Sequence, residues 1–248
     1  MSLLERLSLL SLYDLGALFL LAISWLVLGW MIEHPGKRHP SVTLIMAGYR
    51  RDWMHELVTR DPRIFDATML SSLRQGTAFF ASGCMLAIGG VLAVVGNSQQ
   101  LLVVAADLTL EEVPAFIWQL KLMVVVLFLT NGFLKFVWAN RLFGYCAVMM
   151  AAVPNEIDHP MAYPRAAQAA EINIRAALNF NRGLRAIYFS LGTLAWLLGP
   201  LALLLATAFV TGLIWRREFS SHARSILQEP PTPNRDPAKP GSHDTRTP

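Results

Sequence analysis

Histidine and cysteine are the residue types that would build a metal or haem site in this chain, and their spacing does not favour one. Cys84 lies within the second long apolar stretch and Cys146 just beyond the third, and no C-x-x-C or H-E-x-x-H occurs. The histidines all lie outside the apolar stretches, so they cannot pair between membrane helices as haem ligands. They are His34, His39, His55, His159, His222 and His243. We expect no cofactor and no metal.

Motifs for group transfer are missing as well. The chain has no G-x-S-x-G and no glycine-rich phosphate loop. A catalytic site dispersed along the chain is still compatible with these observations. The expectation is therefore a protein that is more readily explained without catalysis, and no residue is assigned a catalytic role.

Two ionisable residues fall inside apolar stretches, where a charge is costly and therefore often functional. Asp14 lies near the start of the first stretch and Lys121 near the start of the third. They form a candidate intramembrane pair across two helices. The alternative is that Lys121 extends its ammonium to the outer lipid headgroups.

A second group of polar residues flanks the apolar stretches and forms a candidate cytoplasmic cluster. Asp66 is its one carboxylate, and the spacing of Arg63 and Asp66 places both on one helix face. Ordinary positive charge on the inner side of a membrane protein explains this group, and so does a site for an anion or a phospholipid headgroup. The cluster comprises Arg63, Asp66, Arg74, Lys135, Arg141 and Arg185.

Long apolar stretches determine the elements that must position these residues. The chain of 248 residues is 54% hydrophobic and 15% charged, and about 20 helical residues cross a bilayer core. Membrane spans are predicted at 12–32, 75–95, 115–138 and 187–215. The fold class is all-α: a four-helix transmembrane bundle with helices 2 and 3 extended into the cytoplasm and additional cytoplasmic helices. Residues 1–227 form one membrane domain, and the proline-rich tail 228–248 is predicted to be disordered.

Basic residues predict the orientation, because they remain on the cytoplasmic side. The loop 33–74 contains seven Lys/Arg, the loop 96–114 none and the loop 139–185 five. The first and third loops are thus inside, and with four spans both termini are outside. The basic C-terminal tail contradicts this result, unless residues 187–215 form a re-entrant hairpin bent at Gly199-Pro200, which would place the tail inside.

Further helices and packing faces follow from the pattern. Residues 41–59 form an amphipathic helix that lies at the headgroups or packs on neighbouring segments, and residues 165–185 form an alanine-rich cytoplasmic helix. Small residues that allow close helix approach mark two predicted packing faces. The first comprises Gly76, Gly83, Ala87 and Gly90, and the second Gly192, Ala195, Gly199 and Ala202.

Five segments give this chain a resemblance to a known family. They are 51–54 (RDWM), 63–82 (RIFDATMLSSLRQGTAFFAS), 135–148 (KFVWANRLFGYCAV), 179–189 (NFNRGLRAIYF) and 215–219 (WRREF). In their order and spacing they resemble the domain-of-unknown-function 599 family of bacterial and plant membrane proteins. The resemblance implies an integral membrane protein of about four spans, here placed in a bacterial inner membrane. It implies no activity, and hence no catalytic residue. The polar positions that match are Arg51, Arg63, Asp66, Arg74, Lys135, Arg141, Asn181 and Arg185.

Two functions are expected from these observations. The first is a non-enzymatic membrane component that oligomerises or binds a partner protein through its small-residue faces. The alternative is an oligomeric channel or transporter for an anion or lipid headgroup. The lipid bilayer and its anionic headgroups are the expected partners, and a net charge of +4 is too small to predict nucleic-acid binding.

Overall fold

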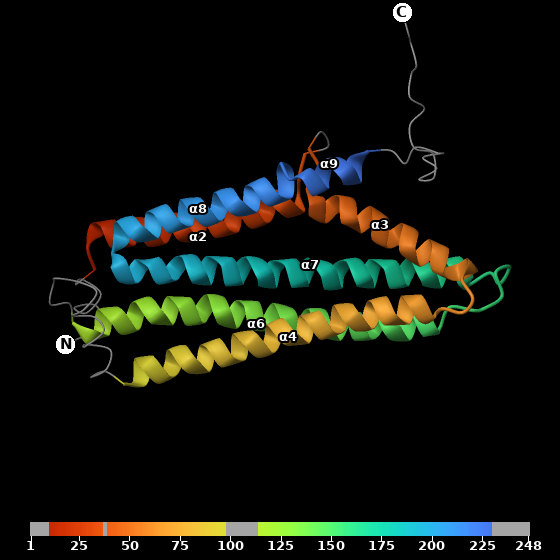
Figure 1. Ribbon diagram of the computed structural model, residues 1–248, viewed down its shortest axis with the longest axis horizontal. Coiled ribbons are helices and arrows are strands. Elements are labelled where there is room, and N and C mark those ends of the chain that lie inside the picture. The colour runs from red at the N-terminus through yellow and green to blue at the C-terminus, as the bar shows by residue number, and fades with distance from the viewer. Residues whose placement is uncertain (1–9, 37–38, 98–113, 230–248) are drawn as a thin grey trace, which may run out of the picture.

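The computed structural model describes residues 10–36, 39–97 and 114–229, and within these ranges the chain is helical (Figure 1). The all-α class is confirmed, and four helices are long and apolar enough to cross a membrane. Most of the predicted loop 96–114 and of the tail 228–248 lies outside the described residues. The α-helices are α2 (Leu12–Glu33), α3 (Val42–Glu56), α4 (Ile64–Gly96), α6 (Ala115–Ala151), α7 (Ala162–Leu194), α8 (Pro200–Phe219) and α9 (His222–Gln228).

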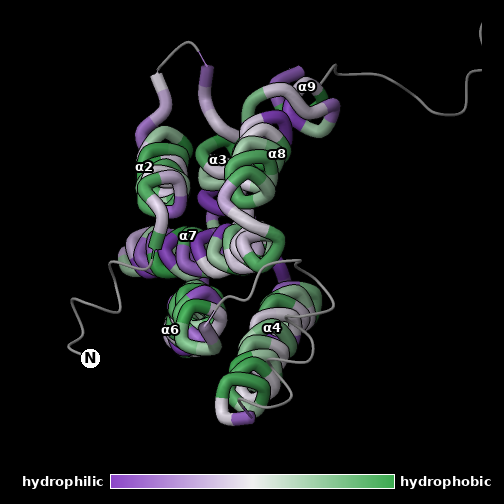
Figure 2. Tube along the Cα trace, turned by 90° about the vertical axis from the view of Figure 1, so that its left-hand side faces the viewer, coloured by the Kyte–Doolittle hydropathy of each residue, from purple (hydrophilic) through white to green (hydrophobic). Residues whose placement is uncertain are grey.

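Helix α7 lies at the centre of three layers (Figures 1 and 2). Helices α2 and α8 cover one side of it and α6 the other, with α4 packed on the outside of α6. The molecule has an apolar half, formed by α2, α8 and the adjoining parts of α4, α6 and α7. Its polar half comprises α3 and the remaining parts of α4, α6 and α7. Each half has its own buried cluster, one around Phe189 and Trp196 and the other around Phe143 and Met54.

Residues 187–215 do not form one span, which corrects the sequence prediction. They continue α7 to Leu194, pass through a short 3-10 helix (Ala195–Leu198) and turn back into α8. Gly199 has a φ of 113°, a value that favours glycine, and Pro200 suits the first position of the next helix. The two helices are antiparallel, because Gly192 of α7 lies against Val210 of α8. The chain thus reverses direction at Gly199-Pro200, as the alternative predicted, and the first arm of the hairpin is the end of the longer helix α7.

The predicted cytoplasmic helix 165–185 is likewise not a separate element. It is the first part of α7, which runs without a break through Arg185 into the apolar half. The amphipathic helix 41–59 corresponds to α3 and the 3-10 helix Leu57–Thr59 that follows it. It packs along α7, so that Ala47 and Met54 are buried.

The predicted small-residue faces are corrected in part. A Cβ added at Gly76, Gly83 or Gly90 would meet nothing, and Ala87 is exposed, so this face of α4 contacts no other described helix. The second face is interrupted by the turn: Gly192 packs on α8, but Ala195, Gly199 and Ala202 do not share a helix with it as one stripe.

Two glycines that the sequence analysis did not select also lie at close contacts between helices. A Cβ on Gly132 of α6 would lie 3.4 Å from the Gly183 carbonyl of α7 and 3.6 Å from the Cys84 sulfur of α4. One on Gly183 would lie 2.7 Å from the Phe136 ring. Glycine here lets α4, α6 and α7 converge at one level.

Candidate functional site

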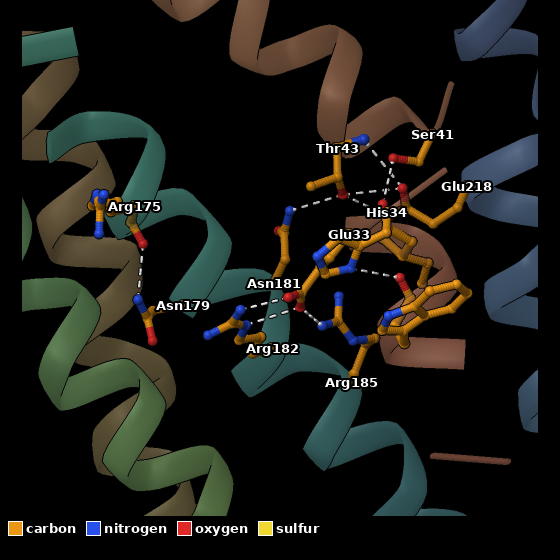
Figure 3. Close-up of polar contacts among 12 residues, drawn as sticks. Glu33, His34, Ser41, Thr43, Arg175, Asn179, Asn181, Arg182, Arg185 and Glu218 are labelled. Carbon is orange, nitrogen blue, oxygen red and sulfur yellow. Dashed lines mark hydrogen bonds and ion pairs between the residues drawn. The ribbon is translucent and has the colours of Figure 1, made fainter. Parts of the chain in front are cut away.

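Polar side chains from four helices converge where the apolar and polar halves meet (Figure 3). We call this group the polar junction. The end of α2, the start of α3, the middle of α7 and the end of α8 each contribute to it. Its residues are Glu33, Thr43, Asn181, Arg182, Arg185 and Glu218.

Glu33 is the centre of an ion-paired triad. Its carboxylate accepts hydrogen bonds from Arg182 Nε (2.8 Å) and Arg185 Nη2 (2.6 Å), and a third from Arg182 Nη2. The Arg185 side chain is 9% exposed and that of Glu33 16%, whereas Arg182 is 40% exposed. Two charges removed from water in this way require each other, since either one alone would be left buried and uncompensated.

Burial and charge act differently on the two arginines. Hydrogen bonds to Glu33 raise the pKa of Arg182, which is partly open to solvent. Burial lowers the pKa of Arg185, although the same carboxylate opposes the change. Both guanidinium groups start from so high a pKa that they remain charged at physiological pH. The two arginines thus stay charged and hold Glu33 by ion pairs, and they do not serve as groups that exchange protons.

Glu218 joins α8 to the beginning of α3. Its carboxylate accepts hydrogen bonds from the Thr43 backbone N–H (3.1 Å) and the Thr43 hydroxyl (3.0 Å for the closer oxygen). An anion at a helix N-terminus is stabilised by the unpaired N–H groups and the helix dipole. Asn181 of α7 donates to the same hydroxyl at 3.3 Å. The arrangement fastens α3, α7 and α8 to one another.

A cavity of about 210 Å³ adjoins the polar junction and is lined by Thr43, Arg50, Asn181 and Glu218, among others. Arg50 donates a hydrogen bond to the Asn173 side-chain oxygen, and burial lowers its pKa. Across 10–36, 39–97 and 114–229, no three His, Cys, Asp or Glu residues lie together in a way that would hold a metal ion.

The candidate intramembrane pair meets around a tryptophan. Trp196 donates a hydrogen bond from its indole to Asp14 Oδ1 at 2.7 Å. The Lys121 ammonium lies 5.6 Å from the centre of the Trp196 ring and 5.5 Å from that of Trp118. Lys121 is 8% exposed and interacts electrostatically with Asp14. Its side chain is thus held inside the bundle and does not extend along the outside.

Asp66 of the candidate cytoplasmic cluster is bound by residues outside that cluster. Asp66 is fully buried, and its carboxylate is bound by the Trp53 indole (2.7 Å) and by Arg60. Among the described residues, the structure records no hydrogen bond or ion pair between Asp66 and Arg63, Arg74, Lys135 or Arg141. The reason is that α3 and the turn before α4 supply nearer partners than α6 does.

The basic residues of that cluster have separate surroundings. Arg63 donates to the carbonyls of Val153 and Pro154, which fastens the end of α6 to the start of α4. Arg141 is exposed and donates to the Tyr145 hydroxyl, and Lys135 is half-buried. Arg185 belongs to the polar junction. Arg63 and Arg74 do share one feature, a groove between α4 and α6 of about 620 Å³.

Sequence reasoning missed Glu33, Thr43 and Glu218 of the polar junction, and Arg60 and Trp53 around Asp66. One signal was present: Glu33 ends the first apolar stretch, and Arg182 and Arg185 precede the last one. Charges that border apolar stretches fall at similar depths, so they were candidates for pairing. The spacing within the chain cannot indicate which of them meet.

One comparison with known proteins bears on identity. A family model described as "Protein of unknown function, DUF599" matches residues 16–223, and the chain therefore belongs to this family, as the resemblance implied. No curated protein and no solved structure matches the chain.

Proposed function

We propose that this member of the DUF599 family is a five-pass integral membrane protein without a catalytic role, which associates through α4 with a helix of a second copy or of a partner protein. The α4 face that contains Gly83 and Gly90 is the observation on which the proposal rests. The family description gives no activity, so the argument depends on the geometry of the chain.

The number of passes follows from the hairpin. Four helices qualify as candidate spans by length and composition, and the end of α7 adds a fifth because it lies beside α8. Asp14 at the start of α2 contacts Trp196 next to the turn, while Glu33 at the end of α2 contacts Arg182. The hairpin is therefore as deep as α2, and a bilayer that α2 crosses is crossed by both arms of the hairpin.

Five passes reconcile the charges of the loops with those of the tail. With an odd number of passes the two termini lie on opposite sides. If the N-terminus is outside, the end of α8 and the residues after it lie inside, and these include the basic residues Arg216, Arg217 and Arg224. Exposed tryptophans near the inner ends of α2 and α8, Trp30 and Trp215, agree with an interface at this level.

Helix α4 leaves most of its apolar circumference uncovered. Only 6% of the residues in its apolar 18-residue segment are buried inside the protein, compared with 39% in the corresponding segment of α6. Large side chains such as Phe79 and Leu86 are exposed there, and an added Cβ at Gly83, which lies between them, or at Gly90, one turn beyond Leu86, would meet no atom within 4 Å. Small residues flanked by large ones form a groove into which a membrane helix can pack closely.

Photo-crosslinking in native membranes tests the proposal. A photoreactive residue in place of Leu86 on α4 should give a covalent product with a polypeptide: twice the chain mass for a second copy, another mass for a partner. The matched control replaces Leu205 on α8, which is about equally exposed (66% against 77%) and should give lipid adducts alone. Lipid adducts alone at both positions would refute association through α4.

A channel or transporter is the second candidate, and the placement of Lys121 favours it. A buried ammonium between two tryptophans in the apolar half is typical of residues that act on ions or substrates in membranes. This function predicts crosslinked products of increasing mass, up to the mass of a ring with a fixed number of subunits. It also predicts anion flux into vesicles that reconstituted protein supports and that Lys121→Met abolishes.

A further inference from the structure

The groove between α4 and α6 has the composition of a site for an anionic amphiphile. Its volume of about 620 Å³ is within the range of small-molecule sites. The floor is apolar, formed by Ala67, Leu70, Ala147 and Met150. The polar lining includes two arginines, Arg63 and Arg74, and no carboxylate. The groove is therefore positively charged over an apolar floor.

The two arginines differ in how they are engaged. Arg63 is fixed by hydrogen bonds to the Val153 and Pro154 carbonyls, so it contributes charge from a rigid position. Arg74 is exposed, and the structure records no hydrogen bond or ion pair for it among the described residues. Asn140 on the opposite wall is half-buried, and among the described residues it likewise has no recorded hydrogen bond. Arg74 and Asn140 thus have donors available for a ligand.

The position of Arg74 identifies the class of ligand. Residues 62–74 of the chain contain three charges, Arg63, Asp66 and Arg74, whereas 75–95 contain none. Arg74 is therefore the last charged residue before α4 enters its apolar stretch, at the depth where lipid phosphates lie. The groove begins there, since Ala78 and Gln75 line it together with Arg74.

We infer that this groove binds an anionic phospholipid of the adjoining leaflet, with its phosphate between Arg74 and Asn140. Charge complementarity selects the phosphate, the rest of the headgroup lies over the groove toward Arg63, and the acyl chains extend past Gln75 and Ala78 along the apolar stretch of α4. The inference depends on the proposed placement of α4 in the membrane. It does not depend on association through the Gly83 face, and a monomeric protein tests it equally well.

Native mass spectrometry of the full chain in detergent measures the binding. Phosphatidylglycerol should remain bound where phosphatidylcholine is lost, and Arg74→Gln should weaken phosphatidylglycerol binding by about tenfold, as expected for one charge-assisted hydrogen bond. Arg141→Gln is the matched control, because Arg141 is a nearby exposed arginine on α6 that does not line the groove. It should leave the affinity unchanged.

Three results would overturn the inference: equal affinity for both lipids, equal losses in the two arginine variants, or displacement of the lipid by millimolar inorganic phosphate, which indicates a site for free anions. If Arg74→Gln does not fold, Ala67→Trp fills the groove from a position exposed to solvent and should also abolish binding. A photoreactive residue at Ser71 identifies the occupant in membranes. A lipid adduct supports the inference, and an adduct with an acidic polypeptide refutes it.

Discussion

At the scale of single residues, the buried charges of this chain are explained by their partners. Arg185 reaches into the boundary between the two halves because Glu33 meets it there. Asp66 is fully buried, and its carboxylate accepts hydrogen bonds from Trp53 and Arg60. Breaking a buried pair leaves an uncompensated charge, whereas breaking an exposed pair changes little. The buried pair of Glu33 with Arg185 and the exposed pair of Glu171 with Arg51 allow the two cases to be compared.

Glu33→Gln should lower the free energy of unfolding by about 3 kcal/mol, because it keeps the shape of the side chain and removes the charge that Arg185 requires. The control is Glu171→Gln, since Glu171 pairs with Arg51 at about half exposure for both side chains and should cost less than about 1 kcal/mol. Thermal unfolding in detergent measures both variants. Equal losses would mean that the burial of the triad has no energetic consequence.

Gly183→Ala should destabilise the protein by about 1–3 kcal/mol, the usual cost of overpacking. The new methyl group would lie 2.7 Å from the Phe136 ring. That ring is fully buried and stacked on Phe80, so it has no room to move. Gly16→Ala adds the same group in a helix where it meets nothing within 4 Å and should not destabilise. A melting temperature unchanged by Gly183→Ala would contradict the packing described for α6 and α7.

At the scale of the elements, the turn at Gly199-Pro200 determines the architecture. It converts one apolar stretch into two antiparallel helices, and α8 then covers α7 and α2. The 3-10 helix Ala195–Leu198 ends α7, and the positive φ of Gly199 redirects the chain. Without that conformation, residues 187–215 would form one helix of about 45 Å.

Gly199→Ala should therefore cost about 1–3 kcal/mol, the strain of a side chain in this backbone region. Gly212→Ala is the matched control within α8. An added Cβ there meets nothing within 4 Å, and alanine favours a helix, so this variant should be neutral or stabilising. The measurement is the melting temperature of each variant in the same detergent. A Gly199→Ala protein as stable as the parent would show that the turn does not require positive φ.

At the scale of the whole molecule, the polar junction connects the apolar half to the polar half. Helix α7 passes through both, and residues of α2 and α3 are hydrogen-bonded to it where the halves meet (Figure 3). Because Glu218 is bonded to Thr43, the end of the hairpin is joined to the first helix of the polar half. We expect the two halves to unfold together.

The five-pass arrangement predicts that the segment after α8 lies inside. A reporter that is active only outside should be silent when fused after Gln228 and active when fused near Glu111, between α4 and α6. Four passes predict activity at both positions, so the fusion at Gln228 distinguishes the two topologies. Activity there would refute the hairpin as a pair of membrane crossings.

The sequence by itself determined the fold class, the first three apolar helices and the family. These properties depend on composition along a continuous segment: about 20 apolar residues without charge form a membrane-length helix whatever surrounds them. It also indicated the hairpin as an alternative, since Gly-Pro in a stretch too long for one crossing is a local signal. Because a helix of this kind is determined by its own residues, the observed bounds of α2, Leu12–Glu33, differ from the predicted 12–32 by one residue only.

Only the tertiary structure decided which polar groups meet. The sequence placed Asp66 among arginines of α4 and α6, but Trp53 and Arg60 reach it first. Glu33 and Arg185 are 152 positions apart, and their pairing depends on how α2 and α7 pack. Gly132 and Gly183 could not be selected as contact sites either, because a small residue on a helix marks an interface only when another helix faces it. Gly183 faces Phe136, whereas Gly83 faces no described residue of this chain.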